Sequence, residues 1–309
     1  MNDLARAEAI LRAACGDRLH TDFAMAPLTT FRIGGPAALY LEPESEADLS
    51  AVSRAIADTG VDYTVIGKGS NVLVSDRGFE GLVLRLVRGY RWTARDGDRI
   101  TAGGSMPLPA LAGVALRHEL GGLAFGVAIP ASLGGAVKMN AGAHGGQMSD
   151  VLAEVEVFRL LDGTMERLAA AALGFAYRHS DLAADAVVVG ATALLRPGDP
   201  AAIRASMDQA REWRRRTQPL AEPNCGSVFR NPANDHAARL IEDAGLKGTR
   251  VGGAEVSRKH ANFIVAGEGA AAEDVKALME LIGREVASRT GVTLEPEVQM
   301  IGGPDRVSR

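Results

Sequence analysis

Residues 125–146, which read FGVAIPASLGGAVKMNAGAHGG, constrain the fold more than any other stretch of this sequence. The stretch is rich in glycine, and Lys138 is its one charged side chain. Because glycine has no Cβ, the backbone here can pass within van der Waals distance of a flat or anionic ligand and present its N–H groups to it. Pro130 fixes one φ angle, and Ser132 and Asn140 add short hydrogen-bonding groups. The stretch predicts a preformed wall of a ligand site; the alternative is a packed loop between two elements.

A second glycine-rich segment, GKGSN at 67–71, directly follows a predicted buried strand at 61–66. Its glycines allow unusual φ angles, its successive N–H groups can point one way, and Ser70 and Asn71 add further hydrogen-bond partners. The pattern is typical of a phosphate cradle. It is neither a Walker A loop nor a GxGxxG fingerprint, which disfavours the doubly wound dinucleotide-binding fold. A Gly-Gly-Pro turn at 34–36 is either structural or another part of the same ligand wall.

The length and the charge of the chain limit the classes of protein to consider. Its 309 residues suggest two or three domains, and a formal net charge of −4 gives no general attraction to nucleic acid or to an anionic membrane. Cys15 and Cys225 are too few for a disulfide framework, and no Cys/His cluster has the spacing of a zinc site. We therefore expect no metal, no obligate protein partner and a cytoplasmic location. Charged residues interrupt 1–16, which predicts an amphipathic helix and not a signal peptide.

Hydrophobic periodicity and capping signals place the remaining elements. Ser45, with Asp48 three residues on, is a capping-box signature for a helix that ends near Gly60. From residue 201 the pattern becomes helical, so we place a domain boundary near Pro197. Further helices are expected at 108–120, 201–216, 237–244 and 271–289, and further strands at 72–74, 82–86, 100–104, 155–161 and 187–195.

Three short polar stretches have no obvious role in a hydrophobic core, namely 177–180, 224–232 and 295–298. Glu297 stands in an apolar, strand-like run, where a carboxylate is costly to bury unless it is paired, so it is a functional candidate. Ser227 lacks the GxSxG context of a hydrolase nucleophile, and the alternative is a turn serine that caps the backbone. Arg178 is equally compatible with a surface position.

Taken together, these motifs resemble the UDP-N-acetylenolpyruvoylglucosamine reductases, the flavoenzymes that complete UDP-N-acetylmuramate for bacterial peptidoglycan synthesis. The similarity runs from about residue 28 to 302, and the motifs stand in the family's order: TTFRIGGPA, VIGKGSNVLVSDRGF, IPASLGGAVKMNAGA, YRHSDL, GSVFRNP, AGLKGTRVGGAEVSRKHANFIV and EPEVQMIG. The resemblance implies an α+β fold. It comprises a two-domain FAD-binding module of the vanillyl-alcohol-oxidase (PCMH) type at 1–86 and 87–196, and a C-terminal α+β substrate-binding domain at 197–309.

The resemblance also implies non-covalently bound FAD, with NADPH as the reductant. The FAD diphosphate should lie in the 67–71 loop and the rest of the flavin along 130–135 and 140–142. The residues implied to hold FAD are Gly34, Gly35, Gly67, Lys68, Gly69, Ser70, Asn71, Pro130, Ala131, Ser132, Gly134, Gly135, Asn140 and Gly142. Those implied to contact the substrate, UDP-N-acetylglucosamine enolpyruvate, are Tyr177, Arg215, Asn231 and His260.

The implied reaction moves a hydride from NADPH to FAD and then to the enolpyruvyl methylene carbon, which leaves negative charge beside the carboxylate. Arg178 and Glu297 match the family residues that stabilise this charge, and Ser227 matches the acid that protonates the carbon. A carboxyl group helps an anion only when it is protonated or donates through water, so we expect burial to raise the pKa of Glu297. The chain departs from the family at Gln299, where arginine is common, and at His144, where tyrosine is common.

The short segment at 178–197 indicates the subgroup that lacks an extra tyrosine-bearing loop. Two rival functions stay open. One is a sugar or alcohol oxidase on the same fold, which uses oxygen in place of NADPH. Such oxidases often tether FAD through a histidine in the diphosphate loop, where this chain has Ser70 and Asn71. The other is a flavin-binding scaffold or sensor without chemistry, against which the presence of all three catalytic candidates argues.

Overall fold

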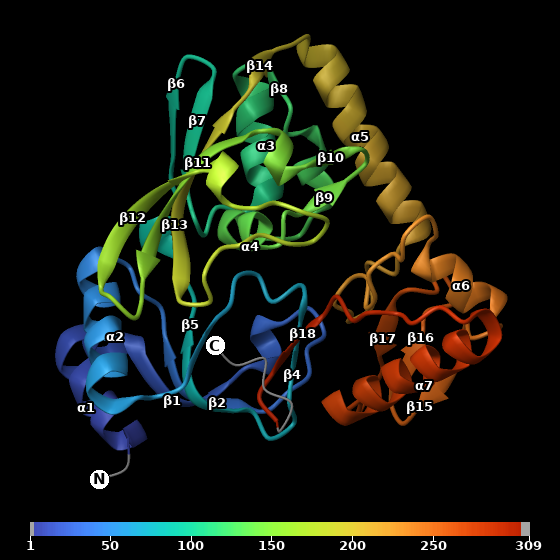
Figure 1. The fold of residues 1–309 in the computed structure, drawn as a ribbon, viewed down its shortest axis with the longest axis horizontal. Helices are drawn as coiled ribbons and strands as arrows, with labels where there is room; N and C mark the ends of the chain where they lie inside the picture. Colours follow the sequence, from blue (N-terminus) through green and yellow to red (C-terminus); the bar gives the residue numbers. More distant parts are fainter. Residues whose placement is uncertain (1–2, 304–309) are drawn as a thin grey trace.

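The computed structural model describes residues 3–303 and arranges them in three parts (Figure 1). In the first part, helices α1 (Asp3–Cys15) and α2 (Glu46–Thr59) pack on a four-stranded sheet in the order β1–β2–β5–β3. Strand β1 is antiparallel to β2, whereas β2, β5 and β3 run parallel. The strands are β1 (Leu19–Ala24), β2 (Pro36–Leu41), β3 (Tyr63–Val65) and β5 (Phe79–Leu84).

Helix α2 begins and ends where its sequence signals predict. The Ser45 hydroxyl accepts a hydrogen bond from the Asp48 N–H (3.3 Å), and the Asp48 carboxylate accepts one from the Ser45 N–H (3.1 Å). These two bonds satisfy donors that a helix N-terminus otherwise leaves unpaired. Gly60 ends the helix in the left-handed region at φ 68°, where a residue without a Cβ is favoured. The predicted capping box is confirmed.

The second part is built on a five-stranded antiparallel sheet in the order β12–β11–β13–β7–β6. Helix α3 (Leu108–Arg117) and the short helix α4 (Leu133–Lys138) pack on it. The strands are β6 (Thr93–Asp96), β7 (Arg99–Gly103), β11 (Leu152–Arg159), β12 (Thr164–Ala169) and β13 (Ala186–Leu194). Two short antiparallel pairs complete this part: β8 (Leu120–Gly121) with β14 (Arg196–Pro197), and β9 (Gly142–Ala143) with β10 (Gly146–Gln147).

Strand β13 is buried on both faces and so joins the first two parts. Val188 lies in the core that contains α3, whereas Val187 and Val189 lie in the core that contains α1 and α2. A strand covered on both faces reads as a continuous apolar run, which is what the sequence shows here. The two parts therefore share one layer of structure.

Helix α5 (Pro200–Thr217) runs along one side of the molecule and connects the second part to the third (Figure 1). The third part contains helices α6 (Ala237–Asp243) and α7 (Ala272–Thr290). They pack with a small antiparallel sheet of β15 (Arg250–Val251), β16 (Ala254–Val256) and β17 (Ile264–Ala266). The helices predicted at 201–216, 237–244 and 271–289 are confirmed to within two residues at each end.

The last strand, β18 (Gln299–Ile301), leaves the third part and returns to the first, where it pairs in parallel with β4 (Val72–Val74). Ile301 packs in the same small core as Val74. The predicted domain boundaries at 86 and 196 stay predictions. The predicted third domain, 197–309, includes this strand, although the strand lies against the first part. A parallel pair between such distant segments has no local sequence signal.

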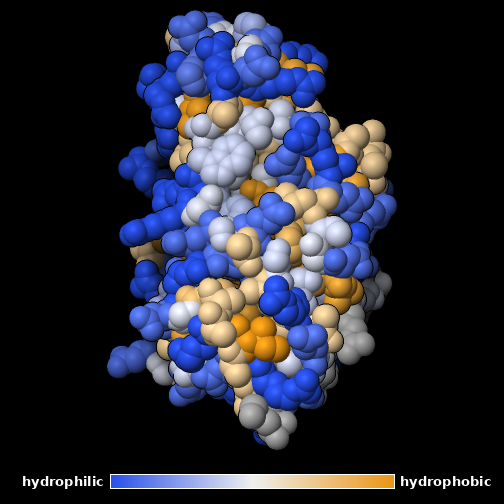
Figure 2. Space-filling model, turned by 90° about the vertical axis from the view of Figure 1, so that its left-hand side faces the viewer, coloured by the Kyte–Doolittle hydropathy of each residue, from blue (hydrophilic) through white to orange (hydrophobic). Residues whose placement is uncertain are grey.

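No helix of the described residues is long and apolar enough to cross a bilayer. The face that includes α1, α2 and β12 is mostly hydrophilic, with hydrophobic residues in small scattered groups (Figure 2).

One contact between parts gives a prediction about stability. Both carboxylate oxygens of Asp76, just beyond β4, accept hydrogen bonds from the first turn of α7, from the N–H groups of Ala272 (2.8 Å) and Glu273 (3.0 Å). Loss of such a cap typically costs about 1 kcal/mol. We expect Asp76→Ala to lower the free energy of unfolding in urea by about that amount. Asp98→Ala, at an exposed turn, is the control and should have no effect; an unchanged Asp76 variant would contradict the capping role.

Candidate active site

A cleft of about 2670 Å³ lies where the three parts meet. Its wall includes the 67–71 loop from the first part, 128–132 and 134–135 from the second and 224–227 from the third. Most of the residues predicted from the sequence line it, namely Gly67, Lys68, Gly69, Ser70, Asn71, Pro130, Ala131, Ser132, Gly134, Gly135, Gly142, Arg178, Ser227, Asn231, His260 and Glu297. Segments far apart in the chain therefore share one site.

The 67–71 loop has the features of an anion cradle. Within the described part of the chain, none of its five backbone N–H groups donates a hydrogen bond to the protein. A Cβ on Gly67 would lie 2.3 Å from the Ser132 hydroxyl, so only glycine allows the loop to approach the 125–146 wall this closely. Burial lowers the pKa of Lys68, and the positive charges of nearby Arg85 and Arg91 lower it further. Free N–H donors beside a surplus of positive charge suit a diphosphate.

The 125–146 wall, which this loop approaches, contains helix α4. The Ser132 hydroxyl caps the helix by accepting a hydrogen bond from the Gly135 N–H (3.4 Å). Gly134 lets the helix approach the sheet, since a Cβ there would lie 3.2 Å from the Val188 carbonyl oxygen. Gly134 and Gly135 therefore let the helix pack closely on the sheet, and on the cleft side they leave a surface without side chains.

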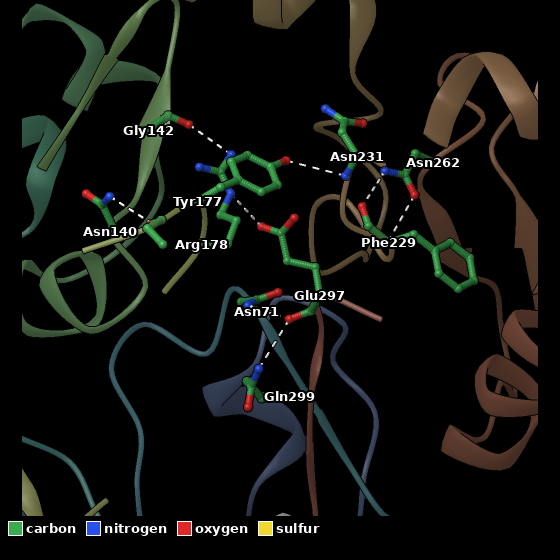
Figure 3. Close-up of polar contacts among 11 residues, drawn as sticks. Asn71, Asn140, Gly142, Tyr177, Arg178, Phe229, Asn231, Asn262, Glu297 and Gln299 are labelled. Atoms are coloured by element: carbon green, nitrogen blue, oxygen red, sulfur yellow. Dashed lines mark hydrogen bonds and ion pairs between the residues drawn. The ribbon is translucent and has the colours of Figure 1, made fainter. Parts of the chain in front are cut away.

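An arginine and a glutamate form an ion pair inside the cleft (Figure 3). The Arg178 Nε donates to the Glu297 Oε1 (2.9 Å), and its Nη2 donates to the carbonyl oxygen of Gly142 (3.0 Å). Only 23% of the Arg178 side chain and 14% of the Glu297 side chain are exposed. Arg178 has φ 55°, in the left-handed region, where a non-glycine residue costs of order 1–3 kcal/mol. The turn that carries it is therefore strained and held by its surroundings.

The environment of Glu297 favours its protonated form. Burial raises the pKa of this carboxyl group, and the nearby Arg178 and Arg230 offset the rise only in part. The Glu297 backbone is fixed at both ends: its N–H donates to the Val228 carbonyl oxygen (2.8 Å), and its own carbonyl oxygen accepts from the Asn71 Nδ2 (3.1 Å). The side chain is therefore held at a defined position, and burial raises its pKa as the sequence predicted.

Ser227 lies on the cleft wall in a segment that a buried asparagine fixes. The side chain of Asn262 accepts a hydrogen bond from the Phe229 N–H (3.0 Å) and donates one to the Phe229 carbonyl oxygen (2.8 Å). The Val228 N–H also donates to the Asn262 carbonyl oxygen (3.0 Å). Three bonds thus hold the residues that follow Ser227. Asn262 was not singled out from the sequence, because nothing local to it indicates a partner 33 residues away.

Known proteins share this arrangement over most of their length. Residues 37–169 match the FAD binding domain family, and residues 218–301 match the UDP-N-acetylenolpyruvoylglucosamine reductase C-terminal domain. The chain is 48% identical over 275 residues to UDP-N-acetylenolpyruvoylglucosamine reductase 2 of Symbiobacterium thermophilum, with 89% of each chain covered. The chain belongs to the UDP-N-acetylenolpyruvoylglucosamine reductase family. It is 46% identical to the reductase of Heliobacterium modesticaldum, over 90% of this chain and 89% of that one.

The crystal structure of the Thermus caldophilus UDP-N-acetylenolpyruvylglucosamine reductase matches with a TM-score of 0.79 and 36% identity, over 90% of this chain and 97% of that one. The predicted fold class, a two-domain FAD-binding module followed by a C-terminal α+β domain, is confirmed. The protein is an FAD-dependent oxidoreductase. The free N–H groups of the 67–71 loop and the positive charge beside it fit such a cofactor.

Five predicted site residues of this reductase do not line the cleft, and packing explains the two glycines among them. A Cβ on Gly34 would lie 2.6 Å from the Val74 Cβ, and one on Gly35 would lie 2.3 Å from the Asp76 carbonyl oxygen. These glycines therefore allow the backbone to pass close to β4. The FAD contacts predicted for them stay predictions. Tyr177 is half-exposed, and its hydroxyl accepts a hydrogen bond from the Asn231 N–H (3.4 Å).

The substrate contact predicted for Arg215, on α5, also stays a prediction. The Arg215 side chain is 76% exposed and pairs with Glu212, outside the cleft. Arg214 lines the cleft instead, and its Nε donates to the Gln218 Oε1 (2.7 Å). Successive helical residues point about 100° apart, so the phase of the helix decides which arginine faces the site.

Of the other two predicted substrate contacts, Asn231 uses its Oδ1 to accept from the Ala237 N–H (3.1 Å) at the start of α6. Burial lowers the pKa of His260, whose Nδ1 has no hydrogen-bond partner among the described residues. A neutral imidazole with an unpaired nitrogen on the cleft wall stays a predicted substrate contact. Asn140, the fifth residue outside the lining, is buried, and its predicted FAD contact stays a prediction.

The raised pKa of Glu297 gives a prediction about stability and pH. As pH rises above about 4.5, the ordinary value, the unfolded chain releases a proton that the folded site retains, so the folded state loses stability until the pH passes the raised pKa. Glu297→Gln removes this titration. We expect the variant to gain stability over the wild type as pH rises from 4.5 to 8, measured by urea unfolding. Glu295→Gln, at an exposed neighbour, should follow the wild type; a falling advantage of Glu297→Gln would refute the raised pKa.

Proposed function

We propose that this reductase uses NADPH to convert UDP-N-acetylglucosamine enolpyruvate into UDP-N-acetylmuramate, in the cytoplasm and for peptidoglycan synthesis. The observation that carries the proposal is the meeting of Arg178, Glu297 and the Ser227 segment in one cleft, beside a loop of unpaired N–H groups. The names of the relatives support the substrate class. When bound, FAD would supply hydride transfer in both directions, from NADPH and to the substrate.

Arg178 is suited to bind the carboxylate of the enolpyruvyl group. Its guanidinium is partly buried and already oriented by Glu297 and by the Gly142 carbonyl oxygen. A planar guanidinium can offer two parallel N–H donors to a carboxylate, and such charge-assisted bonds are the strong ones. When hydride adds to the methylene carbon, negative charge spreads from the adjacent carbon into this carboxylate, and Arg178 stabilises it.

Glu297 supports the same charge through its proton. An ionised carboxylate would repel the developing anion, whereas a protonated one can donate a hydrogen bond to it. Burial raises the pKa of Glu297 and so increases its protonated fraction near neutral pH. The burial that destabilises the ionised form is therefore useful in the reaction.

Ser227 supplies the proton that completes the product. Its O–H bond breaks as a C–H bond forms at the carbon that carries the negative charge, and solvent then restores the proton to the serine oxygen. A hydroxyl is a weak acid, but a carbanion is a strong base, so the transfer is downhill and depends on position. The Asn262 clamp on Phe229 limits the movement of this segment.

The proposal is tested by the visible spectrum of the purified protein under anaerobic conditions. We expect NADPH to bleach the yellow colour and UDP-N-acetylglucosamine enolpyruvate to restore it. Recovery with oxygen alone would indicate an oxidase, and a yellow protein that NADPH does not bleach would indicate a flavin-binding scaffold. Because the 67–71 loop has no histidine to form a tether, denaturation should release all of the FAD.

The role of Ser227 can be separated from that of the cofactor site. In Ser227→Ala, reduction by NADPH should stay close to the wild-type rate, whereas reoxidation by the substrate should slow on the order of 10²–10⁴-fold, the usual range for a lost general acid. Stopped-flow absorbance measures the two half-reactions separately. Ser75→Ala, on the cleft wall near β4, is a control that should leave both rates unchanged. Equal losses in both half-reactions of Ser227→Ala would exclude the acid role.

A further inference from the structure

Asn140 is placed to hold the turn that carries Arg178. The residue is 1% exposed and is not part of the cleft lining. Its Nδ2 donates to the Ala176 carbonyl oxygen (3.0 Å) and to the Gln147 Oε1 (3.4 Å), and its Oδ1 accepts from the Ser149 N–H (2.9 Å). The amide is therefore fully used inside the protein.

The orientation of this amide follows from its partners. The Ser149 N–H can only donate, so it requires the Oδ1, and the Ala176 carbonyl can only accept, so it requires the Nδ2. A carboxylate at the same position would offer two acceptors and would set a negatively charged oxygen against the Ala176 carbonyl oxygen, which can only accept. Asn140 itself has φ 40°, a conformation that asparagine tolerates better than most residues.

The turn that Asn140 contacts is narrow and strained. Ala176 and His179 exchange two backbone hydrogen bonds of 3.2 Å, and Tyr177 and Arg178 lie between them, the latter with positive φ. A residue in this conformation persists only where the surroundings over-determine it. The Ala176 carbonyl is the part of the turn that Asn140 fixes.

The segment 140–142 holds Arg178 at two points. Asn140 binds the backbone of the turn, and two residues later the Gly142 carbonyl oxygen accepts from the Arg178 Nη2 (3.0 Å). Figure 3 shows Asn140 and Gly142 on the same side of Arg178, with Glu297 on the other. The segment thus fixes both the backbone of the turn that carries Arg178 and the position of its guanidinium group.

We propose that Asn140 is a positioning residue for Arg178, which it keeps aimed at Glu297 and at the substrate carboxylate. This inference rests on the proposed function, and it replaces the FAD contact predicted from the sequence. A residue that positions Arg178 affects the substrate step and leaves cofactor binding intact, whereas a residue that binds FAD would affect both.

Two variants test the proposal. Asn140→Asp keeps the shape and removes the donor to Ala176, and Asn140→Gly removes the donor without burying a charge and suits the left-handed backbone. In both we expect wild-type FAD content and wild-type reduction by NADPH. Reoxidation by the substrate should be at least tenfold slower, and half-saturation should need more substrate. Loss of FAD, or equal slowing of both half-reactions, would overturn the proposal.

A double-mutant cycle distinguishes positioning from a general structural role. If Asn140 acts through Arg178, then Asn140→Gly should slow reoxidation no further in an Arg178→Ala background; additive losses would overturn the proposal. Thr192→Val is the matched control. It removes a buried hydroxyl that lies 2.9 Å from the Thr101 hydroxyl in the same part of the molecule, so it should lower stability and leave both half-reactions unchanged.

The wild type, measured alongside, separates the two proposals. If it fails to reduce the substrate, the proposed function is overturned, whereas a competent wild type with an unaffected Asn140→Gly overturns only the role of Asn140. A crystal structure of Asn140→Gly tests the role of Asn140 without a measurement of enzyme activity. It should show the Arg178 guanidinium moved away from Glu297, and an unmoved ion pair would overturn the proposal.

Discussion

The structure depends on the way Glu297 is held by all three parts of the molecule. Its carboxylate pairs with Arg178 from the second part, its carbonyl oxygen accepts from Asn71 of the first, and its N–H donates to Val228 of the third. A buried carboxylate is tolerated only where such partners meet it. The cleft is therefore not a gap between independent domains, since its central acid exists in this form only when the three parts are assembled.

The position of Glu297 depends in turn on strand β18. The strand begins two residues after Glu297 and pairs with β4, which follows directly after the 67–71 loop. One parallel pair thus brings the predicted acid next to the predicted diphosphate cradle. The loops for which we predict anion binding and catalysis lie side by side because each one adjoins a strand of the same pair.

The sequence predicted the elements and residues whose signals are local. The capping box of α2, the apolar run of β13 and the glycine-rich 67–71 loop each carry their own physical reason within a few residues. Helix α4 was missed, because six residues with two glycines have low helix propensity and depend on the Ser132 cap and on packing. Distant partners were missed for another reason. The 140–142 segment and the Arg178 turn have no common pattern in the chain. The sequence therefore could not show whether this segment holds the turn or lines a ligand site.

The core of the third part is not made by the third part alone. Phe31 and Leu73, which belong to the first part, are buried in it together with residues of α6 and α7. The Asp76 contact with the first turn of α7 joins the same two parts with hydrogen bonds. Unfolding of the third part alone would therefore expose apolar surface of the first part to water, which couples the stability of the two parts.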